Sequence, residues 1–210
     1  MANLLIEPGA RVLFQGDSIT DAGRSKEDDS TLGSGYANMT AAWLSAKYPD
    51  HKLTFFNRGI SGNEVFDLEA RWAKDCIDIQ PDWLSILIGI NDVGHELRGE
   101  SDRAPADFEA CYRRILERVK NETRARVIIL EPFLLPGRED QQAWRGGLLP
   151  RIEAARTVAR DFGHRYIPLD GLFGAASTRR EPEFWSVDRV HPTQPGHALI
   201  AQAWIEAVEQ

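Results

Sequence analysis

Cysteine is scarce in this chain of 210 residues, which contains only Cys76 and Cys111. Neither cysteine belongs to a CxxC pair, so the sequence supports neither a disulfide-stapled fold nor a cysteine-bound metal site. We therefore expect both residues to be free thiols on buried faces of helices.

Long apolar runs are also missing, because no stretch approaches the roughly 20 residues that a transmembrane helix needs. The first residues, Met1 to Pro8, carry Glu7 and no basic cluster, unlike a secretory signal. The sequence therefore predicts no membrane span and favours a cytoplasmic location.

Positive charge is in deficit, since 25 lysines and arginines stand against 32 aspartates and glutamates, a formal net charge of −7. Nucleic acids and acidic membranes bind basic surfaces, so neither is expected as a partner. A neutral small molecule or a carbohydrate fits this balance as a substrate. The length and the apolar content of 42% suit one domain over residues 1–210, without internal repeats or linkers.

Five short apolar runs have the character of strands that are buried on both faces. These runs are residues 11–15, 52–57, 83–88, 126–130 and 165–169. Four segments between or after them have helical spacing, namely residues 36–48, 105–122, 149–162 and 195–208. Because strands alternate with helices, the pattern predicts an α/β fold with a parallel five-stranded sheet between two helix layers.

Polar residues flanked by glycine follow the first three predicted strands. Gly16-Asp17-Ser18 follows the first strand, residues 59–62 follow the second, and residues 89–92 follow the third. The carboxyl ends of parallel strands share one edge of the sheet, and ligands bind at that edge. The three loops are therefore expected to meet in a functional site.

Ser18 and His191 are the candidates for a nucleophile and its base. A serine hydroxyl needs a base to take its proton, and a tight turn after a strand can expose it. Asp188 precedes His191 by three residues, so in a turn-like loop its carboxylate could orient the imidazole. Asp17 and Asp21 flank the nucleophile turn and are expected to hold loop N–H groups. The alternatives are a helix cap formed by Ser18 or Asp17 and an ordinary surface Asp–His pair, and each motif alone favours them. Helix capping is also a sufficient explanation for Asp17 and Asp21.

Acyl transfer also needs donors for the oxygen that becomes negative, and three groups could supply them. These are the backbone N–H groups of Ser18 and Gly62 and the side-chain amide of Asn91. Separately, Gly62 is more often a turn glycine and Asn91 more often a cap, but their order after successive strands favours the oxyanion interpretation. Among the other histidines only His95, near Asn91, is a rival, as a contact at the rim or with substrate.

Four ordered blocks resemble those of the SGNH hydrolases, also called GDSL esterases. The blocks are Gly16-Asp17-Ser18-Ile19, the glycine at position 62, the GIND of residues 89–92 and the DRVH of residues 188–191. The resemblance spans residues 11–197 and implies a flavodoxin-like, three-layer α/β/α fold. It also implies Ser18 as nucleophile, His191 as base and Asp188 as its orienter, with Ser18, Gly62 and Asn91 as the oxyanion hole.

A closer likeness is to the bacterial intracellular acetylxylan esterases of this family. It is carried by the runs GDSITDAGR, NRGISGNEVFDLEARW, QPDWLSILIGINDV and WSVDRVHPTQPGH. Such enzymes deacetylate xylo-oligosaccharides, and some assemble into larger homo-oligomers. The resemblance therefore implies an acetylated oligosaccharide as substrate and a possible homo-oligomer.

Residues around the blocks have supporting interpretations. Phe184 and Trp185 could form an apolar wall or a platform on which a sugar stacks, although core or interface packing explains them at least as well. Arg58 could pair with Asp17 or Asp92 behind the site, and an exposed arginine is the alternative.

Together these patterns predict a serine carboxylic ester hydrolase that removes short acyl groups through an acyl-enzyme, with no cofactor and no metal. The short charged loop from His95 to Pro105 favours a small acyl group and a polar alcohol. A lysophospholipase or thioesterase on the same scaffold is one alternative. A metal-dependent phosphoesterase using Asp17, Asp92 and His191 and a non-catalytic flavodoxin-like binding module are the others.

Overall fold

The computed structural model describes residues 3–137 and 139–209, and its centre is a five-stranded sheet. The strands are β1 (Arg11–Gly16), β2 (Thr54–Asn57), β3 (Trp83–Leu87), β4 (Arg126–Leu130) and β5 (Arg165–Ile167). Their spatial order is β2-β1-β3-β4-β5, and every neighbouring pair is parallel. This is the strand order of flavodoxin-like folds, so the predicted fold class is confirmed.

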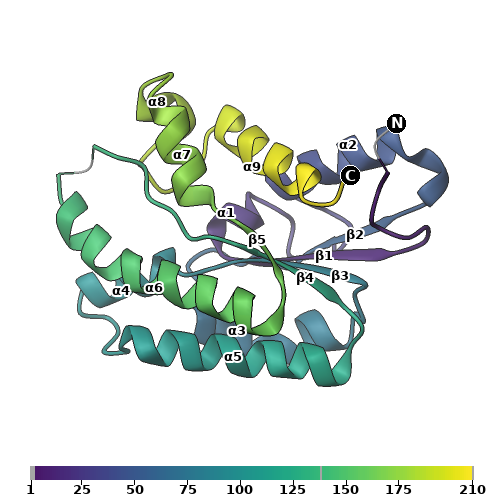
Figure 1. Ribbon diagram of the computed structural model, residues 1–210, viewed down its shortest axis with the longest axis horizontal. Coiled ribbons are helices and arrows are strands. Elements are labelled where there is room, and N and C mark those ends of the chain that lie inside the picture. Colours follow the sequence, from purple (N-terminus) through teal and green to yellow (C-terminus); the bar gives the residue numbers. More distant parts are fainter. Residues whose placement is uncertain (1–2, 138, 210) are drawn as a thin grey trace.

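Helices cover both faces of the sheet (Figure 1). One layer contains α2 (Tyr36–Lys47), α7 (Leu169–Ser177), α8 (Pro182–Trp185) and α9 (Gln194–Glu206). The other contains α3 (Val65–Trp72), α4 (Ile90–Leu97), α5 (Pro105–Glu122) and α6 (Gln141–Phe162). The short elements are α1 (Ser18–Asp21), the 3₁₀ turn η1 (Pro49–His51) and the π-helical turn η2 (Ala73–Ile77).

Side chains of the central strands alternate between two apolar clusters. Phe14 points into the cluster under α2 and α9, where its ring lies 5.7 Å from the Tyr36 ring and 5.5 Å from the Trp204 ring, measured between centroids. Leu13 points into the cluster formed with α3 and α5, which includes Trp72. Because helices bury both faces, the strands are apolar along nearly their whole length.

Several predicted boundaries were wrong, among them the following three. Helix α6 begins at Gln141, not at 149, and continues through Pro150. The second strand begins at Thr54 because Lys52 ends η1 in the left-handed region, with φ of 50°. The fifth strand ends at Ile167, since α7 begins at Leu169.

The two cysteines and the chain ends agree with a compact, disulfide-free core. Cys76 and Cys111 are buried and free, as predicted.

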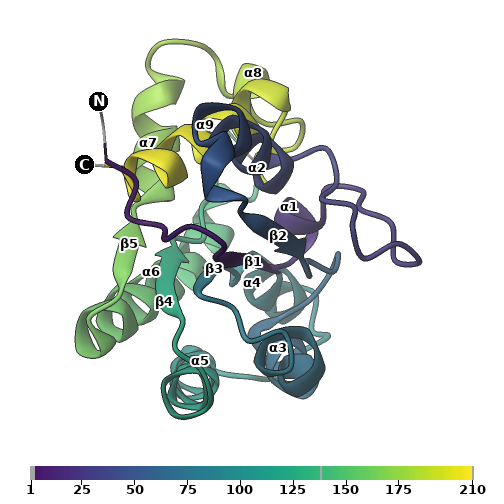
Figure 2. The ribbon, with the colours of Figure 1, turned by 90° about the vertical axis from the view of Figure 1, so that its right-hand side faces the viewer.

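Near the two ends of the chain, Leu4 forms a β-bridge with Glu209, so these segments lie together (Figure 2). In the part of the chain that the structure describes, no helix has the length and apolar character needed to cross a membrane.

Candidate active site

Ser18 lies at the tight turn between β1 and α1. It is the first residue of α1, and Asp17 caps this helix by accepting a hydrogen bond from the Ile19 N–H at 3.0 Å. A Cβ at Gly16 would lie 2.3 Å from the Leu87 carbonyl oxygen, so the turn has room only for glycine. The turn therefore fixes where the serine hydroxyl leaves the sheet.

Ser18, His191 and Asp188 form a continuous chain of hydrogen bonds. Ser18 Oγ lies 2.9 Å from His191 Nε2, and His191 Nδ1 lies 2.7 Å from Asp188 Oδ2. Asp188 Oδ1 also accepts the N–H groups of Val190 and His191, at 3.0 and 2.7 Å. The side chains of Asp188 and His191 are each 47% exposed, so the chain is open to solvent.

Asp188 remains a carboxylate in this setting. Partial burial would raise its pKa, but hydrogen bonds from the backbone and ring of His191 and from the Val190 N–H lower the pKa below its usual value. An ionised Asp188 that accepts from Nδ1 leaves Nε2 as the acceptor facing the Ser18 hydroxyl.

The loop that carries His191 is closed by a small β-bridge between Ser186 and Pro192. The buried Ser186 hydroxyl donates to the carbonyl oxygen of His191 at 2.8 Å. Sequence reasoning missed Ser186, because no motif marks it. The Trp185 ring packs edge-on against Phe184, 4.9 Å between centroids, and against the core. Trp185 therefore takes part in packing, as one of the two interpretations of this residue predicts.

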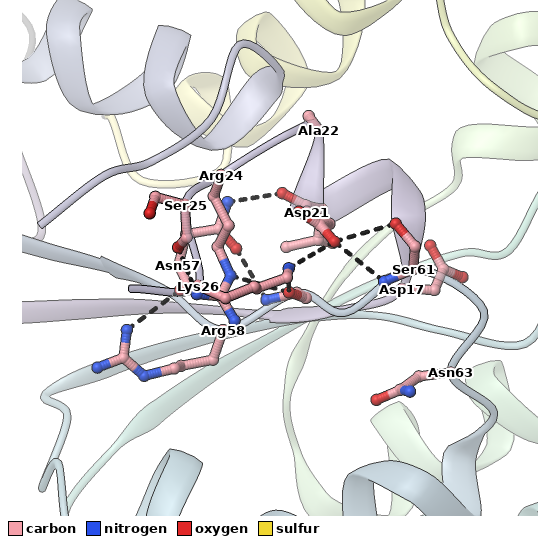
Figure 3. A network of polar contacts seen from close by, with 12 residues as sticks. Asp17, Asp21, Ala22, Arg24, Ser25, Lys26, Asn57, Arg58, Ser61 and Asn63 are labelled. Carbon is pink, nitrogen blue, oxygen red and sulfur yellow. Dashed lines mark hydrogen bonds and ion pairs between the residues drawn. The ribbon is translucent and has the colours of Figure 1, made fainter. Parts of the chain in front are cut away.

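The loop after β2 is held between α1 and α4. Both the N–H and the hydroxyl of Ser61 donate to Asp21 Oδ2 at 3.0 Å (Figure 3). Gly62 follows with φ of 84°, and a Cβ there would meet no atom within 4 Å. The side-chain amide of Asn91 donates to the carbonyl oxygen of Asn63 at 3.1 Å. Asn63 directly follows Gly62, so this amide contacts the same loop as the glycine.

Asp21 is ionised as well as buried. Burial would raise its pKa, but hydrogen bonds from Lys26 and Ser61 lower the pKa below its usual value. Lys26 Nζ lies 2.6 Å from Asp21 Oδ2, the same oxygen that accepts from Ser61. The expectation that a flanking aspartate holds loop N–H groups is met for Asp21, whereas Asp17 caps α1, as the alternative interpretation predicts.

His95 lies one helical turn after Asn91 on α4 and contacts Glu64. His95 Nδ1 is 2.6 Å from Glu64 Oε1, and Arg103 Nη1 is 2.8 Å from Glu64 Oε2. Glu64 is buried, and sequence reasoning missed it although it follows the glycine block by two residues. The pair with Glu64 fixes the ring of His95 beside the loop that contains Gly62.

The predicted pairing of Arg58 with Asp17 or Asp92 was wrong. Arg58 follows β2, an edge strand, and its Nη2 instead lies 3.0 Å from Asp29 Oδ2. Burial raises the pKa of both Asp17 and Asp92 to about 7, which is the behaviour of carboxyl groups without a cationic partner in contact.

The metal-site alternative needs Asp17, Asp92 and His191 in one cluster. Among the residues that the structure describes, no group of three or more His, Cys, Asp or Glu side chains could hold a metal ion. The two aspartates are instead buried and accept backbone N–H groups, from Ile19 and Val65 respectively. The observed side-chain positions therefore do not assemble that ligand set.

The structure combines a flavodoxin-like sheet with a hydrogen-bonded chain of Ser18, His191 and Asp188, an arrangement of residue types that recurs in hydrolases on unrelated folds. Comparison with known families agrees, since the model of the GDSL-like Lipase/Acylhydrolase family matches residues 14–199. The chain belongs to this family, the GDSL or SGNH hydrolases, and is a carboxylic ester hydrolase.

Individual relatives resemble almost the whole chain. An acetylxylan esterase of Geobacillus stearothermophilus is 33% identical over 97% of this chain and 95% of its own length. The crystal structure of Axe2, an acetylxylan esterase of that organism, superposes with a TM-score of 0.89 at 31% identity, covering 98% of this chain and 96% of the other. A protein of Parabacteroides merdae described as GDSL-like lipase gives a TM-score of 0.93 at 35% identity, covering 98% of both chains.

Proposed function

We propose that this enzyme removes acetyl groups from acetylated xylo-oligosaccharides or related sugars, with Ser18, His191 and Asp188 as its catalytic triad. The observation that carries the proposal is the unbroken contact from Ser18 Oγ to His191 Nε2, 2.9 Å, and from His191 Nδ1 to Asp188 Oδ2, 2.7 Å. Solved structures of Axe2 include catalytic mutants in which a serine, an aspartate or a histidine is replaced by alanine, which supports the same three residue types here.

In the proposed reaction, Ser18 Oγ attacks the ester carbonyl carbon while His191 Nε2 accepts the hydroxyl proton. The backbone N–H groups of Ser18 and Gly62 and the Asn91 amide donate to the oxygen that becomes negative. The C–O bond to the sugar then breaks, and the departing oxygen takes the proton from His191. Water, activated by the same imidazole, attacks the acyl-enzyme and releases acetate and free Ser18.

The surroundings of the triad support a small acyl group on a polar alcohol. The triad is open to solvent, and the segment that follows α4 carries Arg98 and Glu100, an exposed ion pair. Relatives described as acetylxylan or acetyl-xylooligosaccharide esterases support the sugar. His95 and Trp185 are proposed as substrate contacts at the rim. The proposal further includes one domain over residues 1–210, a cytoplasmic location and homo-oligomeric assembly.

Substitution of the triad tests the mechanism. Ser18→Ala and His191→Ala should each reduce kcat for p-nitrophenyl acetate by about 10⁴-fold or more, because nucleophile and base act as one unit. Asp188→Asn should retain more activity than either. His51→Ala, in η1 and away from the triad, is the matched control and should hydrolyse the ester at the rate of the unaltered enzyme. An unchanged rate for His191→Ala would contradict the proposed base.

A substrate panel tests the sugar. We expect acetate release to be fastest from acetylated xylo-oligosaccharides, slower from aryl acetates and slowest from long-chain acyl esters. Rates that rise with acyl chain length would favour a lysophospholipase or thioesterase instead. Hydrolysis of no ester, with unaltered ligand binding by Ser18→Ala, would favour the non-catalytic binding module.

A further inference from the structure

A cavity of about 450 Å³ lies beside the loop that follows β2, and cationic side chains outnumber anionic ones in its lining. Its lining residues are Arg24, Lys26, Asp29, Arg58, Ile60, Lys74 and Asp75. Four cationic side chains face two carboxylates there, an excess of two positive charges, whereas the whole chain has a net charge of −7. The excess makes this cavity a site for negative charge.

Arg24 is a buried cation that contacts only neutral acceptors. It is 8% exposed, and it donates from Nε to the Gly59 carbonyl oxygen at 2.9 Å and from Nη1 to the Ser25 carbonyl oxygen at 3.2 Å. No carboxylate of the described residues lies within 4.0 Å of its guanidinium nitrogens. Burial lowers the pKa of Arg24 and the nearby Arg58 lowers it further, whereas the carboxylates of Asp21, Asp29 and Asp75 raise it from a distance. Buried charges are normally paired by direct contact, and the guanidinium of Arg24 has no such contact with a carboxylate.

Arg58 is the second buried cation of the cavity, and its contact with Asp29 shows which chemical group can serve as a counter-ion there. It is 9% exposed, and its Nη2 lies 3.0 Å from Asp29 Oδ2. The Asp29 side chain is 74% exposed and reaches the cavity from a surface loop. A carboxylate therefore fits against this guanidinium. Because Asp29 itself is largely exposed, it can swing into solvent, and an external anion could then take its place as the counter-ion of the buried guanidinium.

The cavity borders the loop that leads to Gly62. The carbonyl oxygen of Gly59 accepts from Arg24 Nε at 2.9 Å and from Lys26 Nζ at 3.1 Å. Lys26 also binds Asp21, the carboxylate that holds Ser61 (Figure 3). The basic side chains and the active-site loop therefore share contacts.

We propose that this cavity binds a small oxyanion, a carboxylate or phosphate group, between Arg24 and Arg58, with Asp29 displaced. The group comes from one of two sources. It is either the carboxylate of an acidic sugar carried by the oligosaccharide or a free anion. The first source rests on the proposed function, whereas binding itself does not.

Calorimetric titration of the intact protein with sodium phosphate and with sodium glucuronate, at constant ionic strength, tests the site. We expect saturable binding of at least one of these anions. Arg58→Gln should weaken it about tenfold or more, because a charge-assisted hydrogen bond is lost. Lys74→Gln, at an exposed position in η2, should weaken it without risk to folding. Arg160→Gln, a 74% exposed arginine on α6, is the control and should bind normally.

The variant Asp29→Asn distinguishes a site for an external anion from an ion pair that serves only Arg58 and Asp29. Removing the competing carboxylate should tighten anion binding several-fold. Asp28→Asn is the matched control, because Asp28 lies in the same loop and bonds Ser30 instead of Arg58. No saturable binding, or binding that Arg58→Gln and Asp29→Asn both leave unchanged, would overturn the proposal.

Kinetics with two substrates distinguish the sources. If the substrate carries the anion, Arg58→Gln should raise KM for acetylated xylo-oligosaccharides with a glucuronosyl branch and not for unbranched ones. If the anion is free, the variant should lose phosphate or glucuronate binding with equal KM values for both. Calorimetry needs no catalysis, so an enzyme inactive on both sugars would count against the proposed substrate and not against the anion site.

Discussion

Asp21 links Ser18, the proposed nucleophile, to the loop that carries the proposed oxyanion donor, Gly62. It lies in the same short helix as Ser18, and one of its oxygens accepts from both the N–H and the hydroxyl of Ser61. Ser61 immediately precedes Gly62, whose N–H is proposed to stabilise the oxyanion. The carboxylate therefore sets the position of that N–H relative to the serine.

Replacing Asp21 should damage transition-state binding more than substrate binding. For Asp21→Ala we expect kcat to fall about 10–100-fold with KM nearly unchanged, because loss of an oxyanion donor costs 10²–10³-fold in kcat. The inhibition constant of a boronic acid, which forms a tetrahedral adduct, should rise in parallel. Asp28→Asn, at the surface, should change neither value. An equal loss of substrate and boronate affinity would contradict this positioning role.

The site residues that could be predicted from the sequence are those that stand in a short motif or at a fixed spacing from one another. Ser18, Asp188 and His191 stand in short motifs, and the structure brings these three together. Glu64 could not be found in this way, because it contacts His95 and Arg103 only after distant segments pack. The partner of Arg58 was mispredicted for the same reason. Ser186 contacts His191 within the same loop, but no motif marks it.

Among the elements, α1 and the loop after β2 are in direct backbone contact. A Cβ at Gly59 would lie 2.3 Å from the Asp21 nitrogen and 2.7 Å from the Thr20 carbonyl carbon. These atoms are backbone, so they cannot move aside as a flexible side chain would. Glycine at this position lets the loop reach the nucleophile helix.

Gly59→Ala should therefore destabilise the protein by about 1–3 kcal/mol, the usual cost of overpacking, and lower kcat. Gly174→Ala is the control, because Gly174 lies in α7 and a Cβ there would meet nothing within 4 Å. This control should raise the free energy of unfolding by up to about 1 kcal/mol through helix propensity. Urea unfolding of both variants measures the difference, and equal effects would show that the close approach is unimportant.

Helix α6 shows why element boundaries were harder to predict than element types. Gly146, Gly147 and Pro150 are poor helix formers, so local preference places the start of the helix near 149. In the structure a Cβ at Gly147 would lie 2.9 Å from Val93 Cγ1 of α4, so the glycine lets these helices approach closely. Tertiary packing therefore extends the helix beyond what its sequence favours.

At the scale of the whole molecule, buried carboxyl groups couple stability to pH. Burial, with the nearby Glu64, raises the pKa of Asp92 from 3.8 to about 7. Between these values the folded protein keeps a proton that the unfolded chain releases. The contribution of Asp92 to the free energy of unfolding is therefore present at low pH and lost as pH rises towards 7.

Asp92→Asn should remove this dependence, since an amide has no proton to lose. Relative to the unaltered enzyme, the variant should gain stability between pH 5 and pH 8, by at most about 3 kcal/mol, because about two pH units of the shift lie in this range. Urea unfolding at the two pH values measures the gain. Asp28→Asn, whose carboxylate is exposed with its pKa lowered by Ser30, should show no such gain. An equal effect of Asp92→Asn at both pH values would contradict the raised pKa.

The architecture could be predicted because the strands are short apolar runs, most of them separated by helical segments, although α3 between the second and third strands was not predicted. A parallel sheet buried on both faces produces this pattern, and right-handed crossovers leave few ways to connect it. The pattern cannot encode how the loop of residues 25–31 brings Asp29 to Arg58, because these residues are polar and lack periodicity. The basic cavity beside them was therefore absent from the sequence-based account.

The central claim is that Ser18 is the nucleophile and His191 its base. The most direct measurement is covalent labelling with a p-nitrophenyl alkylphosphonate, followed by mass spectrometry of the intact protein and its peptides. We predict one phosphonyl group per chain, attached to Ser18, with labelling absent in Ser18→Ala and strongly slowed in His191→Ala. Stoichiometric labelling of another residue, or full esterase activity in a protein labelled at Ser18, would contradict the claim.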